Sequence, residues 1–234
     1  MAMTKEVTEL LGRFVWAGKI GPLPYEPLTD DERDLFEMDF SILVEKVNKI
    51  DPDVGAELDN RRAFFMEAAA IAKGHWHLPF GGIEPTTGQF GMAFITSQAF
   101  LGANTWSRSL SAGWNDLFGS STSPISGNNT APNRRMYMYG AVLVASPTNP
   151  IRAIRLNANG YDYPVLSLED MRYVKNIGKY YTVISLPKVI LIHPTGSHYV
   201  RALSDTAVTI DVLPIGIMFA EFDYLKTEGN FWIT

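Results

Sequence analysis

MYMYGAVLVA (residues 136–145) and IRAIRLNANGYDYPVLSL (residues 151–168) begin the stretch that decides the fold, which continues to Tyr224. Apolar residues occupy both alternating sets of the first segment, a pattern typical of a strand that is covered on both faces. Shorter apolar segments follow, separated by Pro, Gly and Asn. This spacing predicts an array of β-strands.

The clearest local signal is a turn at Asn159-Gly160. Both residues tolerate the positive φ that a type I′ turn requires at its two central positions. The turn predicts a registered hairpin that places Ala158 opposite Tyr161 and Leu156 opposite Tyr163.

Eight strands are predicted in total, and Pro187 and Pro214 are taken as breaks between strands because proline removes a ladder hydrogen bond. After the hairpin, the strands occupy 180–186, 188–193, 198–203, 206–213 and 215–224. Ser167 followed by Asp170 predicts a short helix at 168–176.

These elements predict a fold that is mainly β with N-terminal helices (α+β). The architecture is an eight-stranded antiparallel β-sandwich, jelly-roll-like. An immunoglobulin-type sandwich or a closed barrel fits the same pattern, because the order of strands in a sheet is not legible in the sequence.

The composition is that of an ordinary globular chain, with 46% hydrophobic and 19% charged residues. The absence of cysteine excludes disulfides, thiolate metal sites and cysteine nucleophiles. Charged residues interrupt the N-terminal segment, and no run approaches the roughly 20 apolar residues of a membrane span. We therefore expect no signal peptide, no transmembrane segment and a cytoplasmic protein.

Charge is unevenly distributed along the chain. The net charge is −5, and residues 26–60 alone carry twelve acidic and three basic side chains. We interpret this region as a solvated acidic face. The N-terminus lacks the strongly basic arm that neutralises packaged nucleic acid, so no direct contact with nucleic acid is expected.

Residues 1–27 are predicted to form an amphipathic arm followed by the proline-rich linker GPLPYEP. Four apolar residues fall at helical spacing, and with a nearby tryptophan they are the candidate subunit-interface residues: Val7, Leu10, Leu11, Phe14 and Trp16. Three placements of the arm are open: on its own domain, on a neighbouring subunit, or on a membrane surface.

Residues 28–74 predict a helical hairpin. Thr29 and Glu32 form a capping box that starts a helix reaching about Lys49. Asp51-Pro52 then caps a second helix, which is predicted to end at Gly74. The very short turn between them predicts an antiparallel pair.

Residues 75–135 form a long connecting region rich in Gly, Ser, Thr, Asn and aromatic residues. Within it we predict a strand at 90–96, a short helix at 107–118 and an exposed loop at 119–133. Residues 136–234 are the predicted β-sandwich core, and 75–234 are expected to form one structural unit.

Metal and catalytic motifs are weak. His75-Trp76-His77 matches the H-x-H start of a cupin metal site, which His193 and His198 would complete. Gly82 stands where cupins have a carboxylate ligand. No nucleophile elbow or phosphate loop is present, so we expect no enzymatic activity, no cofactor and no bound metal.

Two basic doublets, Arg61-Arg62 and Arg134-Arg135, are interpreted as salt-bridged surface rather than as phosphate clamps.

The arm, the helical segment, the aromatic-rich region and the eight-strand array together resemble the jelly-roll major capsid (coat) proteins of icosahedral viruses. The resemblance is one of architecture and lies mainly in residues 136–224. It implies a structural, self-assembling virion protein that forms homo-oligomers, trimers or larger capsomers, tied together by arms and loops. RNA-packaging members usually bear a basic N-terminal arm. Its absence here implies an inner face that meets other virion proteins or an internal membrane.

Two alternatives from other classes stay open. The first is a carbohydrate- or ligand-binding β-sandwich module, with Trp76, Trp106 or Trp114 as stacking platforms. The second is a cupin-like metalloprotein. Oligomeric state, the response of tryptophan fluorescence to sugars, and metal analysis distinguish the three.

Overall fold

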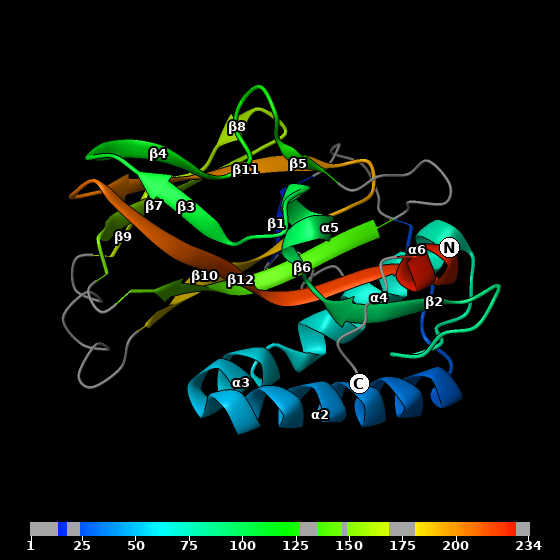
Figure 1. The fold of residues 1–234 in the computed structure, drawn as a ribbon. Coiled ribbons are helices and arrows are strands. Elements are labelled where there is room, and N and C mark those ends of the chain that lie inside the picture. The colour runs from blue at the N-terminus through cyan, green and yellow to red at the C-terminus, as the bar shows by residue number, and fades with distance from the viewer. Residues whose placement is uncertain (1–13, 18–23, 127–134, 147–148, 169–180, 228–234) are drawn as a thin grey trace.

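The computed structural model describes residues 14–17, 24–126, 135–146, 149–168 and 181–227. Over these residues the chain forms three layers: two six-stranded β-sheets that face each other, and a layer of helices that covers one sheet (Figure 1). The predicted class, mainly β with helices near the N-terminus, is confirmed.

Sheet A, which carries the helices, has the strand order β1-β10-β6-β12-β2, and β3 also pairs with β12. Every pair in this sheet is antiparallel except β1 with β10, which is parallel. Its strands are β1 (Phe14–Ala17), β2 (Phe90–Phe94), β3 (Ser107–Leu110), β6 (Arg135–Ala145), β10 (Thr182–Ile192) and β12 (Val208–Glu221).

Sheet B has the order β4-β11-β7-β8, with β5 also paired to β11 and β9 to β7. All of its pairs are antiparallel. Its strands are β4 (Gly113–Phe118), β5 (Ile125–Ser126), β7 (Ile151–Ala158), β8 (Tyr161–Asp162), β9 (Leu166–Ser167) and β11 (Ser197–Ser204). No helix of the described residues covers the outer face of this sheet (Figure 1).

The prediction of eight strands is wrong, because the described residues form twelve. At three positions in the sheets, two short strands stand in place of one long strand. β2 and β3 pair with successive parts of β12, β4 and β5 with successive parts of β11, and β8 and β9 with successive parts of β7. Hydrophobic periodicity does not reveal such interruptions, because the strand pieces are too short to show a period.

Two predicted strand features are confirmed. β6 is buried along most of its length on both faces. The β7–β8 hairpin pairs Ala158 with Tyr161, and the backbone N–H of Tyr163 donates to the carbonyl of Leu156 at 2.9 Å. Asn159-Gly160 has φ values of 51° and 78°, as a type I′ turn requires.

Pro187 and Pro214 do not end strands, contrary to the prediction. β10 runs through Pro187 at an irregularity in its pairing with β6, between Ser185 and Ile190. β12 also continues through Pro214. This proline lies between the part of β12 that pairs with β3 and the part that pairs with β2. A proline without an N–H donor is tolerated where the ladder is irregular or one neighbouring strand is missing.

The region predicted to connect the helices to the sandwich supplies strands to both sheets. The predicted strand at 90–96 is confirmed as β2, but the helix predicted at 107–118 is wrong. β3 and β4 occupy that segment because β12 and β11 offer them ladder partners. Apart from β1, the sheets therefore begin at Phe90 rather than at 136. The helix predicted at 168–176 lies, from 169 onward, outside the described residues.

The helical layer consists of α2 (Asp30–Ile50), α3 (Pro52–Asp59) and α4 (Arg62–Trp76). The predicted capping box is confirmed: the Thr29 hydroxyl accepts from the backbone N–H of Glu32, and the Glu32 carboxylate accepts from that of Thr29. The side chain of Asp51 caps α3, with Pro52 in its first turn, as predicted.

The single second helix predicted up to Gly74 is instead two helices, broken at Asn60-Arg61. Arg61 Nη2 donates to the carbonyl of Gly140 in β6 at 2.9 Å, which fixes the break against sheet A. α4 continues past Gly74 and ends in the left-handed cap His77. Gly74 serves close packing, because a Cβ there would lie 2.7 Å from the backbone nitrogen of Tyr25.

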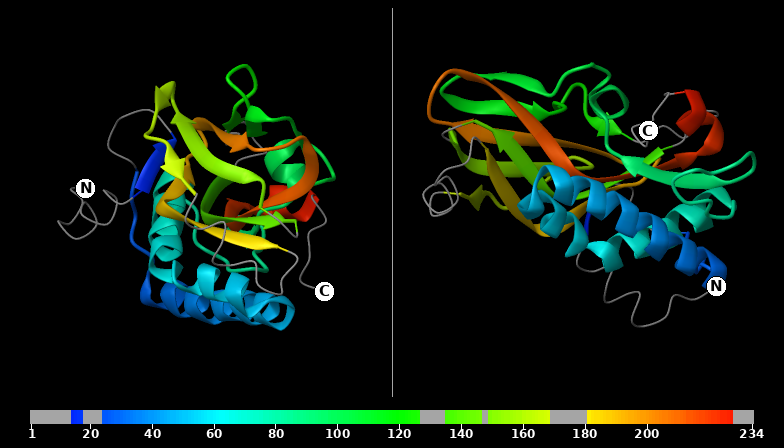
Figure 2. Two further views of the ribbon diagram at one scale, coloured as in Figure 1. Left: turned by 90° about the vertical axis from the view of Figure 1, so that its left-hand side faces the viewer. Right: turned by 60° about the horizontal axis from the view of Figure 1, so that its bottom comes forward.

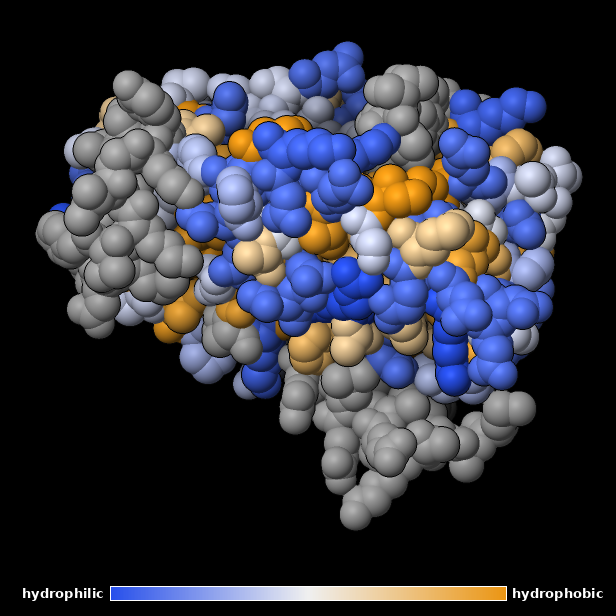
Figure 3. All heavy atoms as spheres, turned by 90° about the horizontal axis from the view of Figure 1, so that it is seen from below, coloured by the Kyte–Doolittle hydropathy of each residue, from blue (hydrophilic) through white to orange (hydrophobic). Residues whose placement is uncertain are grey.

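Two hydrophobic cores follow from this layering. One lies between the sheets and receives Tyr137 and Tyr139 from β6. The other lies between sheet A and the helices and receives Met136 and Met138 from the opposite face of the same strand. Figure 2 shows the three layers from two further sides. The outer surface of the helical layer is mainly hydrophilic, with separate apolar patches (Figure 3).

Candidate functional site

The predicted interface residues are only partly within the described residues. Val7, Leu10 and Leu11 lie outside them. Phe14 and Trp16 lie in β1, a strand that pairs with residues 189–192 of β10. The helical spacing of the arm therefore predicts the wrong conformation at Phe14, which is in a strand. The aromatic and β-branched sequence FVWA favours a strand, and the edge of β10 offers backbone hydrogen bonds.

β1 is an addition to the edge of sheet A rather than a continuation of the sandwich. It is four residues long, it is the only parallel strand among the described residues, and it passes close to β7 of sheet B. Residues 18–23, outside the described part, separate it from the rest of the chain. The edge of β10 therefore accepts a strand from a separate segment.

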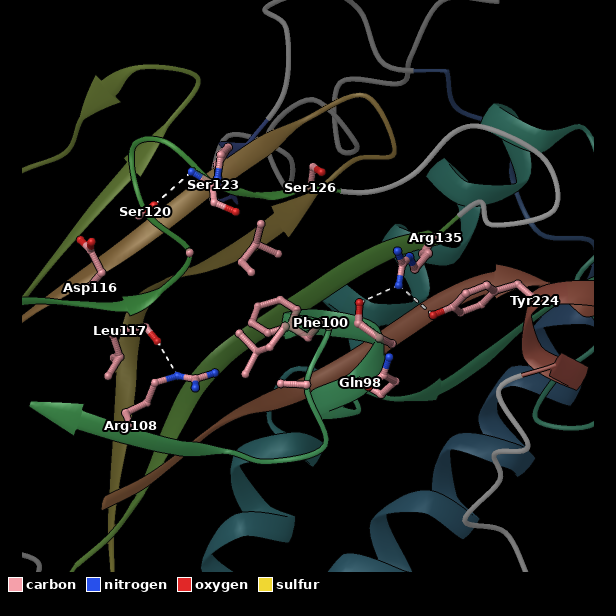
Figure 4. Close-up of a pocket in the computed structure, with 17 residues that line it drawn as sticks. Gln98, Phe100, Arg108, Asp116, Leu117, Ser120, Ser123, Ser126, Arg135 and Tyr224 are labelled. Carbon is pink, nitrogen blue, oxygen red and sulfur yellow. Dashed lines mark hydrogen bonds between the residues drawn. The ribbon is translucent and has the colours of Figure 1, made fainter. Parts of the chain in front are cut away.

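A second candidate site is a groove of about 640 Å³ on the other side of sheet A from the helical layer (Figure 4). It lies around α5 (Ser97–Leu101) and is bounded by β3, β4, β5 and the starts of β6 and α6 (Phe222–Thr227). Two arginines, Arg108 and Arg135, line it together with Asp116, several serines and the ring of Phe100. Figure 4 shows the two guanidinium groups on opposite sides of Phe100.

Arg135 is held by neutral acceptors. Its Nη1 donates to the carbonyl of Ala99 at 2.6 Å and to the hydroxyl of Tyr224 at 2.8 Å. The guanidinium also lies over the Tyr224 ring, 4.9 Å from its centroid. Nε is buried and has no hydrogen-bond partner among the described residues. Arg135 therefore forms no salt bridge with the described residues, contrary to the prediction for the doublet, and Arg134 lies outside them.

Arg108 is also without a carboxylate partner among the described residues. Its Nε donates to the carbonyl of Leu117 at 3.0 Å and its Nη1 to that of Ser107 at 2.7 Å. Burial lowers the pKa of Arg108, as expected of a cation that is partly desolvated without a counter-charge.

Arg62 shows the contrasting case that the sequence predicted. It pairs with Glu37 at 2.7 Å and with Asp59 at 2.6 Å. Burial opposes the charged form of Arg62, but hydrogen bonds to these two carboxylates outweigh it and raise its pKa. The salt-bridged interpretation of Arg61-Arg62 is confirmed, since Arg61 also pairs with Glu57.

The arginines of the groove are suited to binding anions. The carboxylate in the groove, Asp116, already lies 3.3 Å from Arg201 on the outer face of sheet B. Ser120 accepts a hydrogen bond from the backbone of Ser123, and no histidine lines the groove to activate a serine. Two guanidinium groups with unused donors bind carboxylates or phosphates well.

The four histidines do not converge on one point. His75 and His193 are in ring contact, with centroids 4.4 Å apart, whereas His77 is 81% exposed and His198 is fully buried between the sheets. Among the described residues, no three or more His, Asp or Glu side chains are grouped so as to hold a metal ion.

The three tryptophans proposed as stacking platforms differ in accessibility. Trp76 is buried against Phe90, and Trp106 packs against the core between the sheets. Trp114 is 38% exposed on β4, in sheet B. The carbohydrate-binding alternative therefore depends on Trp114.

No protein-family model matches this chain, and a search of the curated proteins finds no similar sequence. None of the helices that the structure describes is long and apolar enough to cross a membrane.

The buried core between the sheets contains one polar pair with a predictable pH response. The hydroxyl of Tyr139 lies 2.7 Å from Nε2 of His198. Burial lowers the pKa of His198 to about 3. Burial and the nearby His75 lower that of His193 to about 4. Both rings are therefore neutral in the folded protein at neutral pH.

Acid is expected to destabilise the protein through these histidines. Below the unfolded pKa of about 6.5, the unfolded chain binds protons that the folded chain excludes, so stability falls as pH falls towards the folded pKa values. Each group contributes up to about 1.4 kcal/mol per pH unit. Urea unfolding from about pH 7 to about pH 4.5 should therefore show a smaller loss in His198→Gln than in the wild type.

His77→Asn is the matched control, because asparagine tolerates the left-handed backbone of this exposed cap. Its pH dependence should equal that of the wild type. A His198→Gln variant with the full wild-type pH dependence would show that His198 is not the responsible group.

Proposed function

We propose that this protein is a self-assembling structural subunit with a jelly-roll fold, a viral capsid (coat) subunit that forms trimers or larger capsomers. The observation that carries the proposal is the order of the strands. When each interrupted position counts once and β1 is set apart, the described residues form eight strand positions: β2/β3, β4/β5, β6, β7, β8/β9, β10, β11 and β12.

These positions pair from the ends of the array inward. β2/β3 pairs with β12, β4/β5 with β11, β6 with β10, and β7 with β8/β9. The first position thus pairs with the last, the second with the seventh, and so on to the middle. One long antiparallel hairpin rolled into two sheets has this pairing, and such a roll is the jelly-roll arrangement used in viral capsids.

β1 supports the assembly part of the proposal. An edge strand presents unpaired N–H and C=O groups and accepts a strand from the same chain or from another copy. The same four-residue pairing forms in either case, so exchange between identical copies costs little. Residues 18–23 allow a separation of up to about 25 Å between Ala17 and Pro24. The candidate interface residues Phe14 and Trp16 lie in this strand.

Charge supports a second contact between copies. Residues 26–73, which include the helical layer, hold thirteen acidic and six basic side chains. Arg108 and Arg135 lie in the groove on the opposite side of sheet A, without carboxylate partners among the described residues. The two regions of one chain cannot meet, whereas a head-to-tail contact brings the acidic layer of one copy to the arginines of the next.

In this proposal the protein resides in the virion, and its further partners are other virion proteins or an internal membrane. Direct contact with nucleic acid is not part of it.

Deletion of residues 1–17 tests the proposal. Removing β1 is expected to reduce the mass of the assembly and to leave the circular dichroism of the sandwich nearly unchanged, because no sandwich position is lost. The measurement is sedimentation velocity with circular dichroism on the same samples.

Deletion of residues 1–13 is the matched control, because it retains β1. A smaller assembly with the longer deletion alone assigns the contact to β1. An unchanged mass with both deletions would remove the N-terminal segment from the assembly.

A further inference from the structure

A cavity of about 310 Å³ lies between the two sheets, in the space between β6 and β10 on one side and β7 and β11 on the other. Among the described residues, its walls are aliphatic side chains and tyrosine rings, with one lysine: Tyr139, Val142, Ile154, Leu156, Tyr163, Pro164, Leu166, Leu186, Lys188, Ile190 and Val200. Nothing in the proposed assembly uses this cavity.

The interior of the cavity is apolar. Tyr139 brings a hydroxyl, but this group is hydrogen-bonded to the neutral ring of His198. Protein interiors are otherwise packed closely, and water in such a space would find few polar partners. The volume is roughly twice that of an apolar cavity that accommodates benzene, and it falls within the range of small-molecule sites. An elongated hydrocarbon chain of medium length matches this volume and lining.

Lys188 adds one positive charge to this apolar lining. It lies within the irregularity in the pairing of β10 with β6, and it alternates with Leu186 and Ile190, which line the same cavity. Lys188 is exposed to solvent and forms no ion pair with any described residue. A lysine of this kind buries its methylene stem along apolar surface and keeps its ammonium group in water.

We propose that the cavity binds a medium-chain carboxylic acid. The hydrocarbon tail lies between the sheets, and the carboxylate meets the ammonium group of Lys188 at the entrance. In the described part of the lining, an apolar interior combines with one cation that has no ion-pair partner. This combination favours an amphipathic anion over a sugar, which would bring hydroxyl groups into apolar surroundings.

Titration calorimetry of the full chain with octanoate, decanoate and dodecanoate tests whether the hydrocarbon tail lies in the cavity. Each added methylene should tighten binding about fourfold until the tail fills the cavity. Absence of decanoate binding, or affinity that does not depend on chain length, would overturn the proposal.

Lys188→Gln tests the head group. It should weaken decanoate binding about threefold, as expected for an exposed ion pair, and leave binding of decanol unchanged. Lys226→Gln is the matched control, because Lys226 lies in α6 and does not line the cavity. Equal effects of Lys188→Gln on the acid and on the alcohol would rule out the assigned carboxylate contact.

The variant Leu156→Trp tests whether the ligand binds in this cavity. Leu156 is half-buried in the cavity wall, so a larger side chain there should occupy the space and weaken decanoate binding at least about tenfold. A folded variant that binds decanoate like the wild type would place the ligand elsewhere. If the variant does not fold, the dependence of wild-type affinity on chain length still supports or overturns the proposal. None of these results depends on self-assembly, which the N-terminal deletions test separately.

Discussion

Replacing Gly216 by alanine is expected to lower the free energy of unfolding by about 3 kcal/mol or more. Gly216 lies in the interior of β12, where the pairing with β6 changes register. A Cβ at this position would lie 2.0 Å from the carbonyl oxygen of Met138 and 2.5 Å from Cβ of Tyr139. The obstructing atoms include backbone of β6, which β10 holds on its other side, so they cannot move aside cheaply.

Thr209→Ala is the matched control, because it changes an exposed residue of the same strand. Its cost should stay within about 1 kcal/mol, including the loss of its hydrogen bond to Ser109. Urea unfolding followed by tryptophan fluorescence measures both variants. A Gly216→Ala protein as stable as Thr209→Ala would contradict the close crossing of β12 and β6.

Replacing Lys73 by methionine is expected to cost about 3 kcal/mol. Lys73 Nζ donates to Oε2 of Glu32 at 2.6 Å, and the two side chains are only 9% and 10% exposed. The backbone N–H groups of Thr29 and Phe80 also donate to this carboxylate. The variant leaves Glu32 charged and buried without its cation, which is more costly than losing an exposed ion pair.

The pH dependence of this pair follows from the pKa of Glu32. Burial alone would raise that pKa, but the hydrogen bonds from Lys73, Thr29 and Phe80 outweigh it and hold the pKa below its usual value. Glu32 therefore contributes stability that is present above its unfolded pKa and is lost as pH falls through the lower folded value. The cost of Lys73→Met should shrink over the same acidic range.

The double variant Glu32→Leu with Lys73→Met is the control. Replacing both partners with apolar residues should recover part of the loss, because no buried charge is left unpaired. If Lys73→Met alone is nearly neutral at pH 7, the ion pair does not join α2 to α4 as described. Chemical denaturation at neutral and acidic pH measures all three proteins.

The elements that were predicted correctly depend on neighbours in the sequence. Thr29 and Glu32 lie one helical turn apart, and Asn159-Gly160 determines its hairpin from two adjacent residues. The strands at 107–118 were missed because their ladder partners, β11 and β12, lie about ninety residues further along the chain. The prediction that Pro187 and Pro214 end strands is wrong for a related reason. Whether a proline ends a strand depends on the neighbouring strands at that point.

The candidate site was harder to predict than the fold. Phe14 and Trp16 stay predicted interface residues, and their strand conformation depends on the distant edge of β10. The signal in the sequence that distinguishes Arg108 and Arg135 is the lack of acidic residues near them, in contrast to Arg61-Arg62. The cavity between the sheets has no local signal, because its lining comes from both sheets.

Analytical ultracentrifugation of the full chain over a wide concentration range, with electron microscopy of the same samples, tests self-assembly most directly. We predict trimers or larger species whose share grows with concentration, and ordered capsomers or particles in the micrographs. A monomer at every concentration, with no repeated assemblies in the micrographs, would contradict the proposal that this sandwich is a coat subunit.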